Sequence, residues 1–193
     1  MQETNERIIT AALDLMQKYG FKSVTIKDIA LHSGVSEMTV YRHFKTKLGL
    51  LEAAVQQFSY IPAFQRVFEN DITWNLEKDL TLIAESYLLH MENNKPLYLI
   101  AVQDGGRMTD LFGSLLKHME ELLSYLTDYF QTMQDKSLMK KGDPGSQAFT
   151  FLSSLYGYFS SGALAGGRPL SKKTAKDTYI KQITAAFCGG LHV

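Results

Sequence analysis

The sequence predicts an all-α fold of about nine helices. Apolar residues recur three and four positions apart through most of the chain, which is the spacing of one helix face. No stretch sustains the strict alternation of a half-buried strand, and only 4 prolines interrupt the 193 residues. A chain of this length forms one domain, or two small ones that share a connecting helix.

The first predicted helix covers residues 6–19. A basic residue in its last turn, Lys18, and the glycine that follows, Gly20, are typical of a helix end. We expect this helix to pack on the next two and complete a three-helix unit. Its inward stripe consists of Ile9, Ala12, Leu13 and Met16.

The second predicted helix covers residues 26–33. Thr25 and Asp28 have the spacing of a capping box, in which the hydroxyl accepts one free amide and the carboxylate accepts another. Val24 and Ile29 flank this cap with the spacing of a hydrophobic staple. Gly34 follows the helix, where a sharp turn with a left-handed backbone favours glycine.

The third predicted helix covers residues 37–44, with Ser36 as its cap. Val40 and Phe44 lie four positions apart and face inward, so the opposite side is free. Two capped helices joined at a glycine form a helix-turn-helix signature. Such a motif offers its second helix to the major groove of DNA.

Each outward residue of this motif has an expected role on DNA. Thr39 and Arg42 are the best candidates for reading base edges, Met38 for a thymine methyl and Glu37 for cytosine. The remaining residues position the protein on phosphates and carry no sequence information themselves. These positioning residues, with the Ser36 cap, are Thr25, Lys27, Tyr41, His43 and Lys47.

Charge gathers around this motif although the chain as a whole has a formal net charge of +0. Residues 22–47 hold five lysines and arginines against Asp28 and Glu37. A small basic footprint on a neutral body suits a protein that reads a short site, and it disfavours non-specific coating of nucleic acid.

The motif resembles the DNA-binding part of the TetR family of bacterial transcriptional regulators. The resemblance covers residues 8–55, about a quarter of the chain, and it implies an N-terminal helix-turn-helix domain followed by a helical ligand-binding and dimerisation domain. Repression is the default mode of action in that family. The matching residues are Thr25, Ile29-Ala30, Gly34-Val35-Ser36, Tyr41-Arg42-His43-Phe44, Lys47 and Leu50-Leu51.

One departure from the family lies after Lys47. Family members often have acidic residues there, whereas this chain has Leu48-Gly49. The capping box at Thr46 therefore lacks its glutamate, and we expect a looser start of the fourth helix.

The rest of the chain predicts six further helices. The fourth begins near Lys47 and continues towards Ile61, where Pro62 ends or kinks it. We expect a DNA-binding domain over residues 1–47, a connecting helix over 48–62 and a ligand-binding and dimerisation domain over 63–193. The helices of this last part cover residues 76–92, 96–103, 112–133, 147–164 and 171–189; the third of these could also pair as a coiled coil, although its wide apolar stripe favours a buried bundle helix.

A pocket for a small effector is predicted inside the second domain, because that apolar body is larger than dimerisation requires. Its Phe and Met content favours an apolar or aromatic ligand, with Arg107 or His90 as a polar anchor. The alternative is that the same aromatic stripe is ordinary core. The candidate lining residues are Trp74, Tyr87, Met91, Arg107, Met108, Phe112, Leu116, Tyr125 and Tyr156.

A homodimer is expected because one helix-turn-helix reads few bases, whereas two copies ~34 Å apart read a palindrome. The family resemblance implies that the last two helices form the dimer interface. Alternatively, both helices only close a monomer core. The candidate interface residues are Phe149, Leu152, Tyr156, Phe159, Tyr179, Ile183 and Phe187.

Other classes of protein receive little support. The five histidines show no metal-ligand spacing, and the single Cys188 excludes an intrachain disulfide and a cysteine-rich zinc site. We therefore expect no metal, no cofactor and no enzymatic activity; an all-α enzyme, a ligand-independent regulator and a protein-binding adaptor remain the alternatives. No apolar run approaches the ~20 residues that cross a bilayer, so we expect no membrane partner and a cytoplasmic location.

Overall fold

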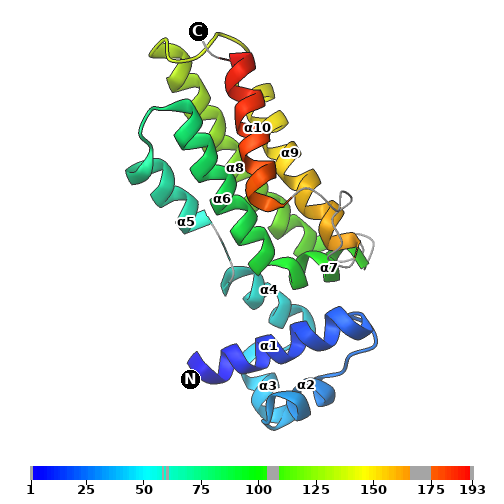
Figure 1. Ribbon diagram of the computed structural model, residues 1–193. Helices are drawn as coiled ribbons and strands as arrows, with labels where there is room; N and C mark the ends of the chain where they lie inside the picture. Colours follow the sequence, from blue (N-terminus) through cyan, green and yellow to red (C-terminus); the bar gives the residue numbers. More distant parts are fainter. Residues whose placement is uncertain (1, 58, 60, 104–108, 166–174, 192–193) are drawn as a thin grey trace. The chain divides into compact units, whose positions relative to one another are not determined.

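The predicted all-α fold is confirmed by the computed structural model, which describes residues 2–57, 59, 61–103, 109–165 and 175–191 (Figure 1). Within these ranges no helix is both long and apolar enough to span a lipid bilayer. The elements are α1 (Gln2–Tyr19), α2 (Ile26–Ser33), α3 (Glu37–Phe44), α4 (Lys47–Gln57), α5 (Ile61–Arg66), a short π-helical segment η1 (Val67–Asp71), α6 (Leu76–Asn93), α7 (Lys95–Gln103), α8 (Thr109–Asp135), α9 (Pro144–Leu164) and α10 (Lys176–Leu191).

The fourth helix is shorter than predicted, and an unpredicted helix follows it. α4 ends at Gln57, and Pro62 is the second residue of α5. Proline is well tolerated in the first turn of a helix because the amide it lacks has no partner there. Pro62 therefore lies in a helix start, and our expectation that it ends or kinks α4 was wrong.

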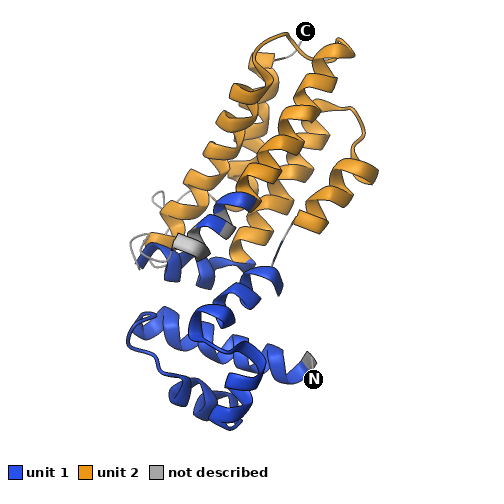
Figure 2. Cartoon of the chain, turned by 180° about the vertical axis from the view of Figure 1, so that it is seen from behind, with its two compact units in different colours: residues 1–59, 93–117 blue, residues 60–92, 118–193 orange. Residues whose placement is uncertain are grey.

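The chain divides into two compact units, coloured separately in Figure 2. The first contains residues 1–59 and 93–117, and the second contains residues 60–92 and 118–193. The first unit thus joins the predicted DNA-binding helices to α4, α7 and the beginning of α8.

The core of the first unit is built from α1, α2, α3, α4 and α7, with α7 packed against α1 and α4. Burial of these apolar side chains provides most of the stabilisation of the unit, at roughly 25 cal/mol per Å² of apolar surface. The fully or almost fully buried residues include Ile8, Ala12, Met16, Ile29, Val40, Leu50, Leu51, Ala54, Leu97 and Ile100.

In the second unit, a buried carboxylate ties three elements together. Asp79 on α6 is 1% exposed. Its Oδ1 accepts hydrogen bonds from the Thr73 amide (2.9 Å) and hydroxyl (2.7 Å), and its Oδ2 accepts one from the Tyr129 hydroxyl (3.0 Å). A buried charge is costly unless it is fully hydrogen-bonded, and three donors satisfy that need here. Burial, with Asp79 beside it, raises the pKa of Tyr129 far above its ordinary value, so the phenol stays a donor.

Trp74 follows Thr73 with a left-handed backbone (φ 60°), which is rare for a bulky residue. Its ring stacks on Tyr129 with 6.0 Å between ring centroids, and the Lys136 ammonium lies 4.2 Å from the indole centroid. Phe68 stacks on Tyr125 nearby, at 5.5 Å. These contacts hold the connection before α6 against α8 and offset the strain at Trp74.

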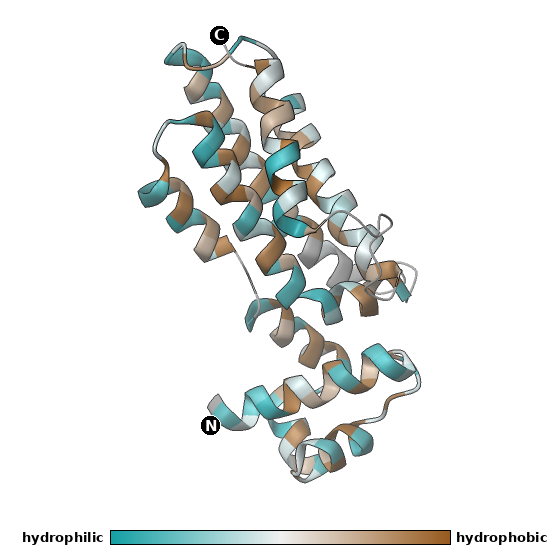
Figure 3. Cartoon of the chain, in the orientation of Figure 1, coloured by the Kyte–Doolittle hydropathy of each residue, from teal (hydrophilic) through white to brown (hydrophobic). Residues whose placement is uncertain are grey.

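α9 and α10 are joined by aromatic contacts and by one partly buried hydrogen bond. The rings of Tyr158 and Tyr179 stack at 4.3 Å, and the Tyr179 hydroxyl donates to the Ser154 carbonyl at 2.6 Å. Phe151 meets Phe187 edge to face at 5.0 Å. Figure 3 shows hydrophobic and hydrophilic residues side by side along these helices, as expected of amphipathic helices that pack with one face.

Candidate nucleic-acid interface

The start of α2 is fixed by the capping box that the sequence predicts. Thr25 Oγ1 accepts a hydrogen bond from the Asp28 amide (3.1 Å) and donates to Asp28 Oδ2 (2.6 Å). The Thr25 amide donates to the same carboxylate oxygen (2.9 Å). These bonds, above all that from the Thr25 hydroxyl, lower the pKa of Asp28 below its ordinary value of 3.8. The positive end of α2 is thus held in place while the side chains of Thr25, Lys27 and Asp28 stay exposed.

The turn between α2 and α3 is built around Gly34, which has the left-handed φ of 67°. The Gly34 amide donates to the Leu31 carbonyl (3.3 Å) and the Val35 amide to the Ala30 carbonyl (3.0 Å), which is a Schellman motif. The Arg7 guanidinium on α1 donates to the Ser33 carbonyl at 2.6 Å. This bond ties α1 to the end of α2, directly before the turn.

The N-cap of α3 is Ser36, whose Oγ accepts a hydrogen bond from the Thr39 amide at 3.2 Å. Ser36 Oγ also lies 2.9 Å from Thr39 Oγ1, so the Thr39 side chain is partly engaged in the cap. Val40 and Phe44 are buried, as predicted, and fix which side of α3 faces outward.

The outward side of α3 is uncovered within its unit. Met38 is 76% exposed and Tyr41 is 49% exposed. Glu37 and Arg42 are exposed as well, and Thr39 and His43 are half-buried. On α2, Thr25 and Lys27 are exposed. One exposed helix side therefore presents most of the residues proposed for base and phosphate contacts.

Lys47 behaves differently from the other predicted DNA contacts. Its ammonium donates to the carbonyls of Phe21 (2.7 Å) and Val24 (2.5 Å), and it lies 4.5 Å from the centroid of the Phe21 ring. Burial lowers the pKa of Lys47, and the nearby Asp28 carboxylate partly opposes that effect. Nothing local in the sequence indicates these contacts, because the acceptors lie 26 and 23 residues earlier.

The start of α4 is capped by Thr46 although the glutamate of a full capping box is missing. Thr46 Oγ1 accepts a hydrogen bond from the Gly49 amide at 2.8 Å. A Cβ on Gly49 would lie 2.5 Å from the Phe44 carbonyl oxygen, a distance that real contacts do not show. The departure at Leu48-Gly49 thus permits a close approach between the end of α3 and the start of α4.

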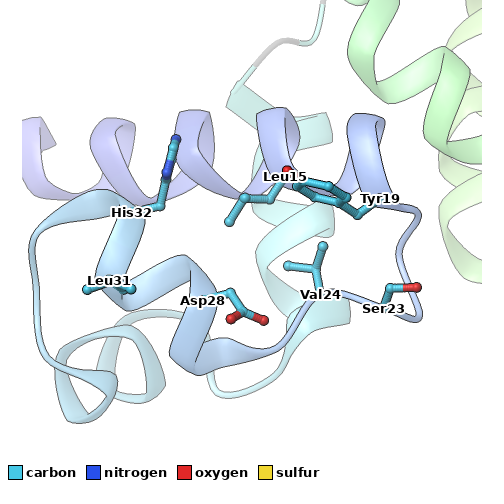
Figure 4. Close-up of a pocket in the computed structure, with 7 residues that line it drawn as sticks. All are labelled: Leu15, Tyr19, Ser23, Val24, Asp28, Leu31 and His32. Carbon is cyan, nitrogen blue, oxygen red and sulfur yellow. The ribbon is translucent and has the colours of Figure 1, made fainter.

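A groove of about 560 Å³ lies beside the motif, between α1 and α2. Figure 4 shows Leu15 and Tyr19 extending from α1, and Asp28, Leu31 and His32 from α2. Ser23 and Val24 line the groove from the connection between the two helices. The groove is distinct from the exposed side of α3, since the two share no residue.

The residues predicted to line an effector pocket fall into several environments. Tyr87 and Met91 are buried in the second unit, Tyr125 and Tyr156 are half-buried there, and Trp74 is 39% exposed. Leu116 is exposed and belongs to the first unit. Burial lowers the pKa of His90, the proposed anchor, which favours its neutral form. Arg107, Met108 and the side chain of Phe112 lie outside the described residues.

The residues predicted for the dimer interface divide into outer and inner groups. Phe149 is 62% exposed, whereas Leu152 and Phe159 are buried within the single chain. Tyr156, Tyr179, Ile183 and Phe187 are half-buried. Phe187 also lines an open groove of about 330 Å³ between α9 and α10. Leu152 and Phe159 therefore belong to the core beneath this face.

Comparison with known proteins decides the family. The family model described as bacterial regulatory proteins, tetR family, matches residues 8–54. An uncharacterised HTH-type transcriptional regulator of Bacillus subtilis, YvkB, is 31% identical over 191 residues, which cover 99% of this chain and 98% of YvkB. The chain belongs to the TetR family. The predicted resemblance is thereby confirmed, and so is the prediction that the protein is a transcriptional regulator and no enzyme.

Solved TetR-like structures share the whole fold at low sequence identity. NalD, a repressor of the MexAB-OprM multidrug efflux pump in Pseudomonas aeruginosa, superposes with a TM-score of 0.76 at 16% identity and covers 99% of this chain and 96% of its own. FadR of Bacillus subtilis, solved in complex with stearoyl-CoA, gives a TM-score of 0.72 at 17% identity, with 97% and 99% covered. At these identities the likeness shows the common fold alone.

Proposed function

We propose that this TetR-family regulator is a homodimeric repressor that binds a palindromic operator and is released by a small apolar or aromatic effector. The observation that carries the proposal is the exposed outer side of α3, held by two buried anchors and two capped helix starts. The DNA partner also implies that the protein acts in the bacterial cytoplasm.

Readout of the operator is assigned to the outward side chains of α3. Arg42, an exposed guanidinium, can donate two hydrogen bonds to one guanine, and such a pair discriminates by roughly 1–3 kcal/mol. Thr39, Met38 and Glu37 lie on the same helix and supply the remaining base contacts. Lys27, Tyr41 and His43 lie around them and position the helix on phosphates.

Binding to DNA upstream of the protein's own gene, measured across salt concentrations, tests this part. We expect affinity to fall steeply with salt because phosphate contacts release counterions. Arg42→Ala should relax preference at one base pair per half-site, whereas Tyr41→Ala should weaken binding to all sequences alike. An unchanged base preference in Arg42→Ala would remove Arg42 from the reading set.

Dimerisation is assigned to the outer faces of α9 and α10. Phe149 is exposed on this surface. A Cβ added at Gly157, Gly189 or Gly190 would meet nothing within 4 Å. Because these glycines have no side chain, a second helix pair can approach the backbone closely there. Light scattering should give the mass of two chains. Phe149→Glu should shift the protein towards monomer, while Leu164→Glu, at the other exposed end of α9, reports how far the interface extends. A wild-type monomer at micromolar concentration would contradict the assignment.

The effector site is assigned to the aromatic and methionine residues of the second unit. The stearoyl-CoA bound to FadR supports an apolar ligand, because the two proteins share one fold. A ligand releases DNA only if it binds the released conformation more tightly than the DNA-bound one. A panel of fatty acyl and aromatic compounds should therefore raise the melting temperature and weaken operator binding together. If no compound does either, the alternative of a ligand-independent regulator is favoured.

A further inference from the structure

We propose that Lys47 is a positioning residue that locks the start of α4 to the connection before α2, and that it does not neutralise a DNA phosphate. The inference rests on the proposed DNA-binding function and assigns Lys47 a different role within it. Lys47 is the first residue of α4, and its two carbonyl partners belong to Phe21 and Val24, in the connection between α1 and α2.

The Lys47 ammonium makes its contacts within the protein. Two of its three N–H donors are directed at the Phe21 and Val24 carbonyls, at 2.7 and 2.5 Å, and the charge faces the Phe21 ring. Hydrogen bonds from a charged donor contribute about twice as much as neutral ones. Only one N–H is left for a phosphate, and turning the ammonium outward to a phosphate would break both bonds and leave two carbonyls without their donor.

The Phe21 and Val24 carbonyls precede the start of α2 in the sequence, so their contact with Lys47 also concerns that helix. Val24 directly precedes Thr25, the cap of α2, whose exposed first turn is proposed to lie against the DNA backbone. Figure 4 shows Val24 and Asp28 side by side at this start of α2. A displacement of Lys47 with α4 therefore moves the start of α2 as well.

The end of α3 is attached to the same point. The Thr46 amide donates to the Phe44 carbonyl at 2.6 Å, and Gly49 lies against that carbonyl without room for a Cβ. The start of α4 thus holds both DNA-facing ends of the motif, α2 through Lys47 and α3 through the Thr46–Gly49 turn. Any effector-driven movement of α4 would shift both together as one body.

The test compares Lys47→Met, which keeps a long unbranched side chain but has no donor, with Lys27→Met, which removes an exposed lysine on α2 proposed to contact phosphate. For Lys27→Met the slope of log affinity against log salt should become shallower by about 0.9 for each lost contact. For Lys47→Met affinity should fall by about tenfold or more at one salt concentration, with the slope unchanged.

A second measurement needs no DNA. Hydrogen–deuterium exchange of the peptide covering residues 20–28 should become faster in free Lys47→Met than in wild type, and should stay unchanged in Lys27→Met. A salt slope reduced as in Lys27→Met, or unchanged exchange in Lys47→Met, would overturn the proposal. If Lys47→Met does not fold, Lys47→Gln keeps a neutral donor and carries both readouts. Absence of DNA binding by the wild-type protein would refute the proposed function instead, and the exchange comparison would still decide the role of Lys47.

Discussion

Gly49 offers the most quantitative test of how α3 is joined to α4. In Gly49→Ala the new Cβ would lie 2.5 Å from the Phe44 carbonyl oxygen, so the two helix ends must separate by about 0.5 Å to reach even the 3.0 Å limit of real contacts. Overpacking against backbone costs about 1–3 kcal/mol. A glycine-to-alanine change within a helix otherwise gains about 0.5–1 kcal/mol. We therefore expect a net loss between about 0 and about 2.5 kcal/mol.

The assay is thermal unfolding at one fixed protein concentration, because the stability of a dimer depends on concentration. A change of 1 kcal/mol shifts the melting temperature of a chain of this size by about 2–4 °C. Gly49→Ala should melt below wild type and bind operator more weakly. Gly113→Ala is the matched control, since its Cβ would meet nothing within 4 Å, and it should melt slightly above wild type. If both variants gain stability equally, the close approach at Phe44 does not exist.

Two further predictions concern other hydrogen bonds. Tyr129→Phe removes a donor to the buried Asp79 carboxylate and should cost about 1–3 kcal/mol in denaturant unfolding, whereas Tyr125→Phe, which keeps its stacking on Phe68, should change little; equal losses would contradict the role of the network. The lowered pKa of Asp28 means that its contribution to stability is present above the ordinary value of 3.8 and is lost as pH falls through the folded-state pKa. Asp28→Asn should therefore be less stable than wild type at neutral pH, with a difference that shrinks in acid; a difference independent of pH would refute this reasoning.

The parts of the site that the sequence predicts well are those fixed by near neighbours. The caps at Thr25 and Ser36 and the turn at Gly34 depend on residues within four positions, so their spacing alone predicts α2 and α3. Val40 and Phe44 identify the inward side of α3 by the same local periodicity.

The parts that could not be predicted depend on distant contacts. From its sequence neighbours alone, Lys47 is interpreted as a phosphate-binding lysine. Only the folded chain brings the Phe21 and Val24 carbonyls to its ammonium. The packing of α7 on α1 likewise joins residues far apart in the sequence. Pro62 is locally ambiguous, because a proline suits both the end of one helix and the first turn of the next.

The most direct test of the account is selection of preferred DNA from a random pool by the purified protein. If α3 is a recognition helix presented twice by a two-fold dimer, the enriched sequences should be inverted repeats with half-site centres about one helical turn of DNA apart, or a multiple of that distance. Enrichment of a single asymmetric motif would contradict the dimer. No enrichment at all would contradict the assignment of α3 to DNA.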